Sequence, residues 1–293
     1  YPKPGNVHRL RDFSDTRFEH YLASSIAVGP SLREAAMRGV AIRHNRLRVQ
    51  RAGLGSLVLA CVKEAKTWHT GGNTVLGSSL LLCPLSIGAG YCGSSHGKIF
   101  PKTLRASTRQ IIEKTTVNDA IQIYQAIRFA AGGSLSKSID ARLPGVLDPT
   151  ASQRMTIEGI TLHQVMANCA WVDGICLEWT NGFYRIFEVG LLALLSAFTQ
   201  TSDINLSVGQ CYLRLLSNYP DTLIAKKSGI NIAENVCAKA KIAWAKGGYL
   251  RRDGRTAISK LDRSLAKRNL NPGTTADLTV ASVMVSILGG LRP

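Results

Sequence analysis

The sequence predicts an all-α protein, built as one large multi-helix domain that spans residues 1–293. Apolar residues recur at three- and four-residue spacing in several segments, which is the period of one face of an α-helix. Segments that alternate apolar and polar residues are scarce, and they do not alternate with helical segments as a parallel α/β sheet requires. The hydrophobic fraction of 45% is typical of a globular chain and too high for a disordered one.

Two helices are predicted in the first half of the chain. The first covers 54–65, and its apolar face consists of Leu54, Leu57, Val58, Cys61, Val62 and Ala65. The second covers 117–127, and its apolar face consists of Val117, Ala120, Ile121, Tyr124 and Ile127. Thr115 or Thr116 precedes the second helix and is suited to cap its first turn.

Two further helices are predicted in the second half. One is expected to run on without a break from Leu162, and its apolar spacing places Asp173 on the core-facing stripe. A carboxylate there is costly unless it pairs with a cation or serves a site, and both alternatives stay open. The segment 278–288 is apolar on nearly all sides and is predicted to be a buried central helix.

The charge balance favours anionic partners. Lys and Arg number 36 against 19 Asp and Glu, for a formal net charge of +17. This excess suits nucleic acid, a membrane surface or phosphorylated metabolites, although a solvated basic surface is the favoured explanation. No apolar run reaches the roughly 18 to 20 residues of a membrane span, so no membrane partner is expected.

The cysteines indicate a reducing compartment. There are seven, an odd number, and no C-x-x-C pair occurs. This pattern argues against a disulfide framework and against a zinc site. A cytoplasmic location is therefore expected.

The first candidate constellation is the loop from Pro2 to Val7, followed by Arg9 and Arg11. Two prolines and a glycine stiffen this loop. Lys3, held in it, is a point charge suited to a phosphate group. The loop is therefore a candidate anion-binding element.

Asp12 and Asp15 follow, three residues apart, just before a predicted helix. They can cap the helix, or they can hold a hard cation such as Mg²⁺ through oxygen ligands. Capping is favoured when the two residues are considered alone.

A second constellation is the loop from His69 to Thr74, which contains two glycines between apolar segments. Glycines let backbone N–H groups approach a ligand, and a helix start of this kind attracts anions. Asn73 or Thr74 can cap the next helix. A plain helix–helix turn is the alternative, and the chain contains no G-K-[ST] loop and no G-x-G-x-x-G.

The third constellation runs from Asn271 to Leu278 and leads into the predicted buried helix. Asp277 is expected in the first turn of that helix. A carboxylate at that place can cap the helix, bind a metal ion or act as a general base. The sequence alone leaves these roles open.

Taken together, these residues resemble the triphosphoribosyl-dephospho-coenzyme A synthase family. The shared features are Lys3-Pro4-Gly5, Gly72-Asn73-Thr74, Pro272-Gly273 and Ala276-Asp277-Leu278, in the family's order along most of the chain. Each motif is short, but the ordered set is much more specific than any one of them. The sequence is most similar to the archaeal-type branch of this family in three further segments, which are Lys3 to Asp15, Trp171-Val172-Asp173 and Pro220-Asp221-Thr222.

The resemblance implies an enzyme that joins the triphosphoribosyl group of ATP to 3′-dephospho-CoA, or to a related acceptor alcohol, with release of adenine. Catalytic carboxylates would come from Asp12, Asp173 and Asp277. Mg²⁺, expected with ATP, would be held by Asp12, Asp15 and Asp277. The nucleotide would be bound by Lys3, Gly5, Asn6, Arg9, Arg11, Gly72, Asn73, Thr74 and Gly273.

The competing interpretation is a non-catalytic basic helical protein that binds nucleotides or nucleic acid. Net charge is its only support. Aromatic residues do not interleave with the basic clusters in a nucleic-acid-binding pattern, so nucleic acid is not the expected partner.

Overall fold

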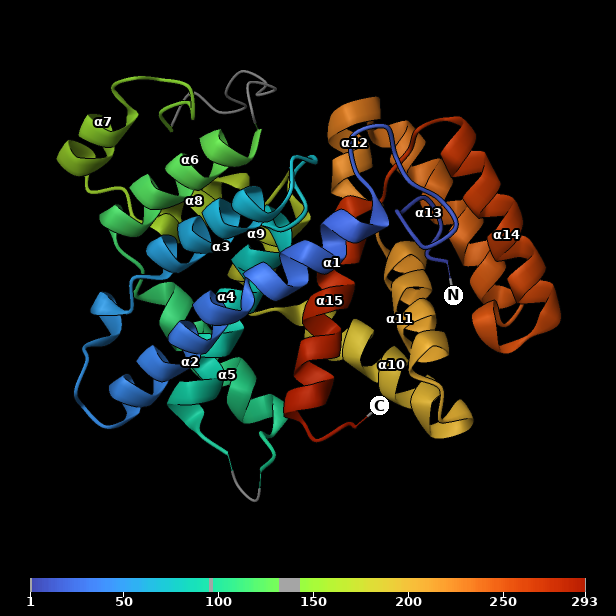
Figure 1. Cartoon of the computed structure of the whole chain (residues 1–293), viewed down its shortest axis with the longest axis horizontal. Helices are drawn as coiled ribbons and strands as arrows, with labels where there is room; N and C mark the ends of the chain where they lie inside the picture. Colours follow the sequence, from blue (N-terminus) through green and yellow to red (C-terminus); the bar gives the residue numbers. More distant parts are fainter. Residues whose placement is uncertain (1, 95–96, 132–142, 293) are drawn as a thin grey trace.

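The fold is built from helices (Figure 1). The computed structural model describes residues 2–94, 97–131 and 143–292, and these ranges contain no β-strand beyond one isolated bridge between His8 and Arg11. The predicted all-α class is confirmed. In chain order the helices are α1 (Phe18–Ala27), α2 (Gly29–Arg43), η1 (Val49–Arg51), α3 (Leu54–Trp68), α4 (Leu76–Cys92), α5 (Pro101–Glu113), α6 (Val117–Ala131), α7 (Ala151–Glu158), α8 (Leu162–Cys169), α9 (Gly174–Asn181), the π-helical turn η2 (Arg185–Gly190), α10 (Leu191–Thr201), α11 (Ile204–Asn218), α12 (Thr222–Ser228), α13 (Ile230–Ala245), η3 (Gly248–Leu250), α14 (Arg252–Lys267) and α15 (Gly273–Leu288).

Helix α15 lies in the middle of the molecule, with α2 to α9 on one side and α10 to α14 on the other (Figure 1). It packs against α4 on the first side and against α10 and α11 on the second. The buried apolar side chains form a larger cluster from α2 to α11 and α15, and a smaller one from α11 to α14. The last helix of the chain therefore packs against helices of both sides.

Two of the predicted helices begin where the sequence indicates. Helix α3 starts at Leu54, and its six predicted apolar residues are all buried. Helix α6 starts at Val117, and the N–H of Asp119 donates to the Thr116 hydroxyl at 3.3 Å. Thr116, one of the two expected caps, is thus the residue that caps α6.

The prediction of one continuous helix through Asp173 is wrong. Helix α8 ends at Cys169, and α9 begins at Gly174. Asp173 has an extended backbone, and its carboxylate accepts hydrogen bonds from the N–H groups of Ile175 and Cys176 at 2.8 and 3.2 Å. A short acidic side chain that binds the backbone two and three residues ahead starts a new helix, so Asp173 caps α9 instead of lying on a stripe.

Helix α15 also departs from expectation in two respects. It begins at Gly273, so Asp277 lies on the second turn and not on the first. One face is open to solvent, because the side chains of Val280 and Ile287 are 45% and 41% exposed, so the helix is not buried all round.

Helix α4 continues through Pro84, which lies in its interior. Proline has no N–H, so the carbonyl of Leu80, four residues earlier, loses its partner within the helix. The indole N–H of the buried Trp179 donates to that carbonyl at 3.0 Å. The proline therefore creates the acceptor through which α9 binds to α4.

In the described part of the chain, no helix taken singly has the length and apolar character to cross a membrane. The bent pair formed by Gly174–Asn181 and Arg185–Thr201, whose members meet at 94°, passes that test on length and composition only when the two are joined.

The starts of α12 and α15 share one buried carboxylate. Asp221 is 2% exposed, and its Oδ1 accepts from the N–H groups of Leu223 and Ile224 at 2.9 and 3.1 Å. Its Oδ2 accepts from the N–H and the hydroxyl of Thr275 at 2.7 and 2.8 Å. Asp221 therefore caps both helices at once.

Removing this double cap should destabilise the protein strongly. We expect Asp221→Ala to lower the free energy of unfolding by roughly 2 to 4 kcal/mol, because it leaves several buried donors without acceptors. Asp203→Ala is the matched control: Asp203 is half-buried and caps only α11, through Asn205 and Leu206, so its loss should cost about 1 kcal/mol. Urea denaturation of the two variants checks the difference, and equal losses would contradict the double-cap role.

Candidate active site

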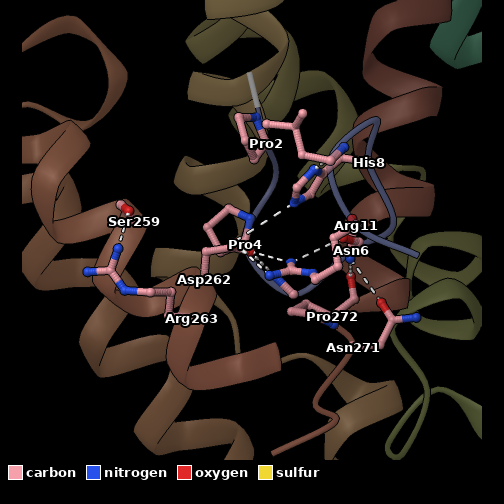
Figure 2. A network of polar contacts seen from close by, with 12 residues as sticks. Pro2, Pro4, Asn6, His8, Arg11, Ser259, Asp262, Arg263, Asn271 and Pro272 are labelled. Atoms are coloured by element: carbon pink, nitrogen blue, oxygen red, sulfur yellow. Dashed lines mark hydrogen bonds and ion pairs between the residues drawn. The ribbon is translucent and has the colours of Figure 1, made fainter. Parts of the chain in front are cut away.

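The N-terminal loop packs on the loop before α15, which brings the first and third constellations together. Gly5 has φ +78°, and a Cβ added there would lie 2.7 Å from the carbonyl oxygen of Leu270 and from Cδ of Pro272. Glycine is therefore required at this contact. The amide of Asn6 donates to Asn271 Oδ1 at 2.9 Å, as Figure 2 shows.

The same loop is bound to α14 through Arg11 (Figure 2). The Arg11 guanidinium donates to both carboxylate oxygens of Asp262, at 2.7 Å to Oδ2. The N–H of Gly5 donates to Asp262 Oδ1 at 3.0 Å. Arg11, predicted as a nucleotide ligand, thus has a partner in the protein that fixes the loop.

Lys3 and Arg9 have different surroundings. Lys3 is half-buried, and burial lowers the pKa of its amine. Within the described residues Lys3 forms no ion pair, which leaves its charge available for a ligand. Arg9 is exposed and lies over the Phe18 ring at 5.6 Å.

Asp12 and Asp15, the two aspartates that follow the first constellation, have different contacts in the structure. Asp12 Oδ1 accepts from the N–H of Phe18, the first residue of α1, at 3.0 Å, which confirms the capping interpretation for Asp12. Asp15 is exposed, and its carbonyl accepts from the N–H of Gly72 at 2.9 Å. The first and second constellations therefore meet at Asp15 and Gly72.

The loop before α4 is held by its own side chains. Asn73 Oδ1 accepts from the N–H groups of Val75 and Leu76 at 3.2 and 3.0 Å, so Asn73 caps α4 as predicted. The Thr74 hydroxyl lies 2.6 Å from the Ser24 hydroxyl and 3.2 Å from His69 Nε2. These bonds fix the loop against α1.

Asp277 reaches across from α15 to the first turn of α4. Its carboxylate overlaps the position that a Cβ on Gly77 would occupy, and it accepts from the backbone N–H of Ser78. Burial raises the pKa of Asp277 well above its ordinary value, and the nearby carboxylates of Asp221 and Asp173 raise it further. Such a carboxylate binds a proton more readily than an ordinary one, as a general base or acid must.

Asp277 and Asp15 both act on Tyr21 of α1. Burial raises the pKa of Tyr21 to about 12, and the charges of Asp277 and then Asp15 contribute in the same direction. Carboxylates from the two ends of the chain are therefore electrostatic neighbours of a single phenol group.

Several residues in this region were not identified from the sequence as site candidates. The Thr222 hydroxyl accepts from the N–H of Gly174 at 2.9 Å and lies 3.0 Å from the hydroxyl of Thr274. The starts of α9, α12 and α15 meet at these hydroxyl groups. The one sequence feature that pointed to these residues was the resemblance to the family at Pro220-Asp221-Thr222.

Arg185 is a second missed residue. Its guanidinium lies over the Tyr219 ring at 4.2 Å, and Nη1 lies 3.3 Å from where a Cβ on Gly174 would be. Its Nε is 3.9 Å from Glu178 Oε1, and burial raises the pKa of that carboxyl to about 7. No sequence signal marked Arg185, because only the packing of η2 against α9 brings it to this place.

A polar surface pocket of about 580 Å³ adjoins Asp15, between the start of α1 and the α3–α4 loop. Besides Asp15 its walls include Arg17, His20, Lys66, Gly71 and Gly72. Gly273, a predicted nucleotide ligand, is not among the residues that line this pocket; it packs against Leu223 of α12.

No group of three His, Cys, Asp or Glu side chains in the described ranges is close enough together to bind a metal ion. Mg²⁺ commonly uses only one or two carboxylates together with water and substrate phosphates. Asp15 is exposed and fits that requirement. Asp12 and Asp15 each use one carboxylate oxygen in a hydrogen bond, Asp12 with the N–H of Phe18 and Asp15 with the hydroxyl of Thr16 at 3.1 Å.

Comparison with known proteins identifies the family. The family model described as ATP:dephospho-CoA triphosphoribosyl transferase matches residues 1–292. A 2-(5''-triphosphoribosyl)-3'-dephosphocoenzyme-A synthase from Escherichia fergusonii is 32% identical over 110 residues, 37% of this chain and 36% of the relative. A probable synthase of the same name from Acinetobacter calcoaceticus is 28% identical over 107 residues, 36% of this chain and 37% of the relative.

The match therefore spans little more than a third of the length of these curated relatives. A crystal structure of an Archaeoglobus fulgidus protein assigned as a triphosphoribosyl-dephospho-CoA synthase superposes with a TM-score of 0.69 at 26% identity, covering 94% of this chain and 100% of that one. Because the family model matches nearly all residues of this chain, the chain belongs to the ATP:dephospho-CoA triphosphoribosyl transferase family.

Proposed function

We propose that the protein transfers the triphosphoribosyl group of ATP to 3′-dephospho-CoA and releases adenine. The names of the family and of its relatives support this activity. The observation that carries the proposal is the meeting of the three sequence motifs: Asn6 with Asn271, Asp15 with Gly72, and Asp277 with the start of α4.

In this reaction a hydroxyl of the acceptor forms a bond to C1′ of the ATP ribose. The bond between C1′ and the adenine nitrogen breaks, and adenine leaves with the electron pair and takes up a proton. Displacement at an anomeric carbon develops oxocarbenium character, as in glycoside chemistry. The enzyme must therefore accept the proton of the hydroxyl and place negative charge near the ribose.

Asp277 is the best candidate for this role. Its raised pKa makes it a better proton acceptor than an ordinary carboxylate. Asp173 and Asp12, the other predicted candidates, each use a carboxylate oxygen to cap a helix. We therefore propose Asp277 as the base and Asp173 as a neighbouring charge that helps to raise its pKa.

Asp15, which lines the pocket described above, would hold Mg²⁺ together with the phosphate oxygens of the nucleotide. The ion would neutralise phosphate charge when bound. We further propose that the protein works in the cytoplasm, because its seven cysteines show no disulfide framework.

The activity is tested by incubating the protein with Mg-ATP and 3′-dephospho-CoA. We expect free adenine, together with a product whose mass equals that of the acceptor plus the triphosphoribosyl group. A reaction without acceptor is the control for hydrolysis. Absence of both adenine and coupled product would refute the proposed activity.

Asp277→Asn should separate catalysis from stability. A pKa raised by folding means that stability falls as pH rises from the ordinary value of 3.8 toward the folded value, because in that range the unfolded chain releases the proton and the folded protein keeps it. Asn removes this pH-dependent loss of stability, so the variant should melt at or above the wild-type temperature at pH 7, with an advantage that is smallest below pH 3.8 and grows as the pH rises above it. Adenine release should fall by about 10² to 10⁴.

Asp203→Asn is the matched control, since Asp203 caps α11 and Asn caps about as well as Asp. This variant should keep both its melting temperature and its activity. Near-full adenine release by Asp277→Asn would leave Asp277 without a catalytic role.

A further inference from the structure

The pocket beside Asp15 gathers positive side chains that have no acidic partners. Arg17 and Lys66 both line it, and neither forms an ion pair in the described ranges. The Lys66 ammonium donates to the carbonyl of Gly71 at 2.9 Å, which leaves two of its three N–H groups for other acceptors. Among the described residues that line the pocket, Asp15 is the only acidic one.

His20 is held as a hydrogen-bond donor in the same wall. Its Nδ1 accepts from the N–H of Arg17 at 3.1 Å, so a neutral ring carries its proton on Nε2. The ring stacks on His69 with centroids 4.8 Å apart and planes 10° from parallel. His69 is fixed in turn, because its Nδ1 accepts from the N–H of Gly71 at 3.1 Å and its Nε2 lies 2.7 Å from the Ser24 hydroxyl.

The two sides of Asp15 differ in charge. On the α15 side, Asp277 has Asp173 and Asp221 as neighbours, and an added polyphosphate would be repelled there. On the pocket side, Arg17 and Lys66 outnumber Asp15, and a volume of about 580 Å³ lies within the range of small-molecule sites. The carboxylate side suits hydroxyl groups of a ribose, and the pocket suits anions.

We propose that this pocket is a polyphosphate-binding site, in which Arg17, Lys66 and His20 bind the anionic oxygens. The proposal deepens the proposed function and rests on it for the identity of the substrates. Both substrates of the proposed reaction carry anionic phosphate oxygens: ATP has them in its triphosphate, and 3′-dephospho-CoA has them in its diphosphate. Asp15 lines the pocket and, like Asp277, is an electrostatic neighbour of Tyr21, so it lies between the pocket and Asp277.

Direct binding of inorganic tripolyphosphate to the full chain tests the site without requiring catalysis. Titration calorimetry should show that Lys66→Met and Arg17→Gln each weaken binding by about 10- to 100-fold, the loss expected for one charged hydrogen-bonding group. Lys63→Met is the matched control, because Lys63 is exposed on the same helix and does not line the pocket. Arg17 is exposed, so its variant should fold even if the loss of the Lys66 bond to Gly71 loosens the loop.

Steady-state kinetics distinguishes the two sources of phosphate. A KM that rises for ATP in the Arg17 and Lys66 variants places the triphosphate in the pocket, and one that rises for 3′-dephospho-CoA places the acceptor's diphosphate there. Wild-type binding of tripolyphosphate by both variants would overturn the inference even if adenine is released. Weakened binding by both variants in a protein that releases no adenine would uphold the site and refute the proposed activity instead.

Discussion

The site depends on the buried carboxylate of Asp221. It accepts from the N–H groups of Leu223 and Ile224 in α12 and from the N–H of Thr275 in α15, so it holds the starts of both helices together. Asp277 lies one turn further along α15. A rotation or shift of that helix would move the Asp277 carboxylate away from α4. The geometry around Asp277 is therefore set by a residue that is itself almost inaccessible to solvent.

Asp277 is a carboxyl group whose position lowers the stability of the folded protein at neutral pH. Its carboxylate fits against α4 only because Gly77 has no Cβ, and the N–H of Ser78 provides a hydrogen bond. Burial nevertheless raises its pKa, and the neighbouring Asp221 and Asp173 raise it further, so the folded protein holds a carboxyl that resists ionisation. Natural sequences accept such a conflict where chemistry requires a proton acceptor of adjusted strength.

The large positive charge of the chain does not by itself identify a binding surface. Arg11 binds Asp262, and Arg38 donates to the carbonyls of Ala52 and Gly53, so both are used to fix loops. Near the candidate site, Lys3, Arg17 and Lys66 form no ion pair within the described residues. Position decides which charge can meet a ligand, because a guanidinium with five donors serves equally well as a loop clamp or as an anion ligand.

The local sequence pattern determined the positions of several helices and their caps, and it indicated the family. The apolar spacing from Leu54 and the cap chemistry of Thr116 and Asn73 act over a few residues, and the ordered short motifs indicated the family. Tertiary structure alone decided the rest. The meeting of Thr222 with Gly174 and Thr274, and the position of Arg185 over the Tyr219 ring, depend on contacts between segments far apart in the chain. Periodicity carries no information about such contacts, because it records which face of a helix is buried and not which helix covers it.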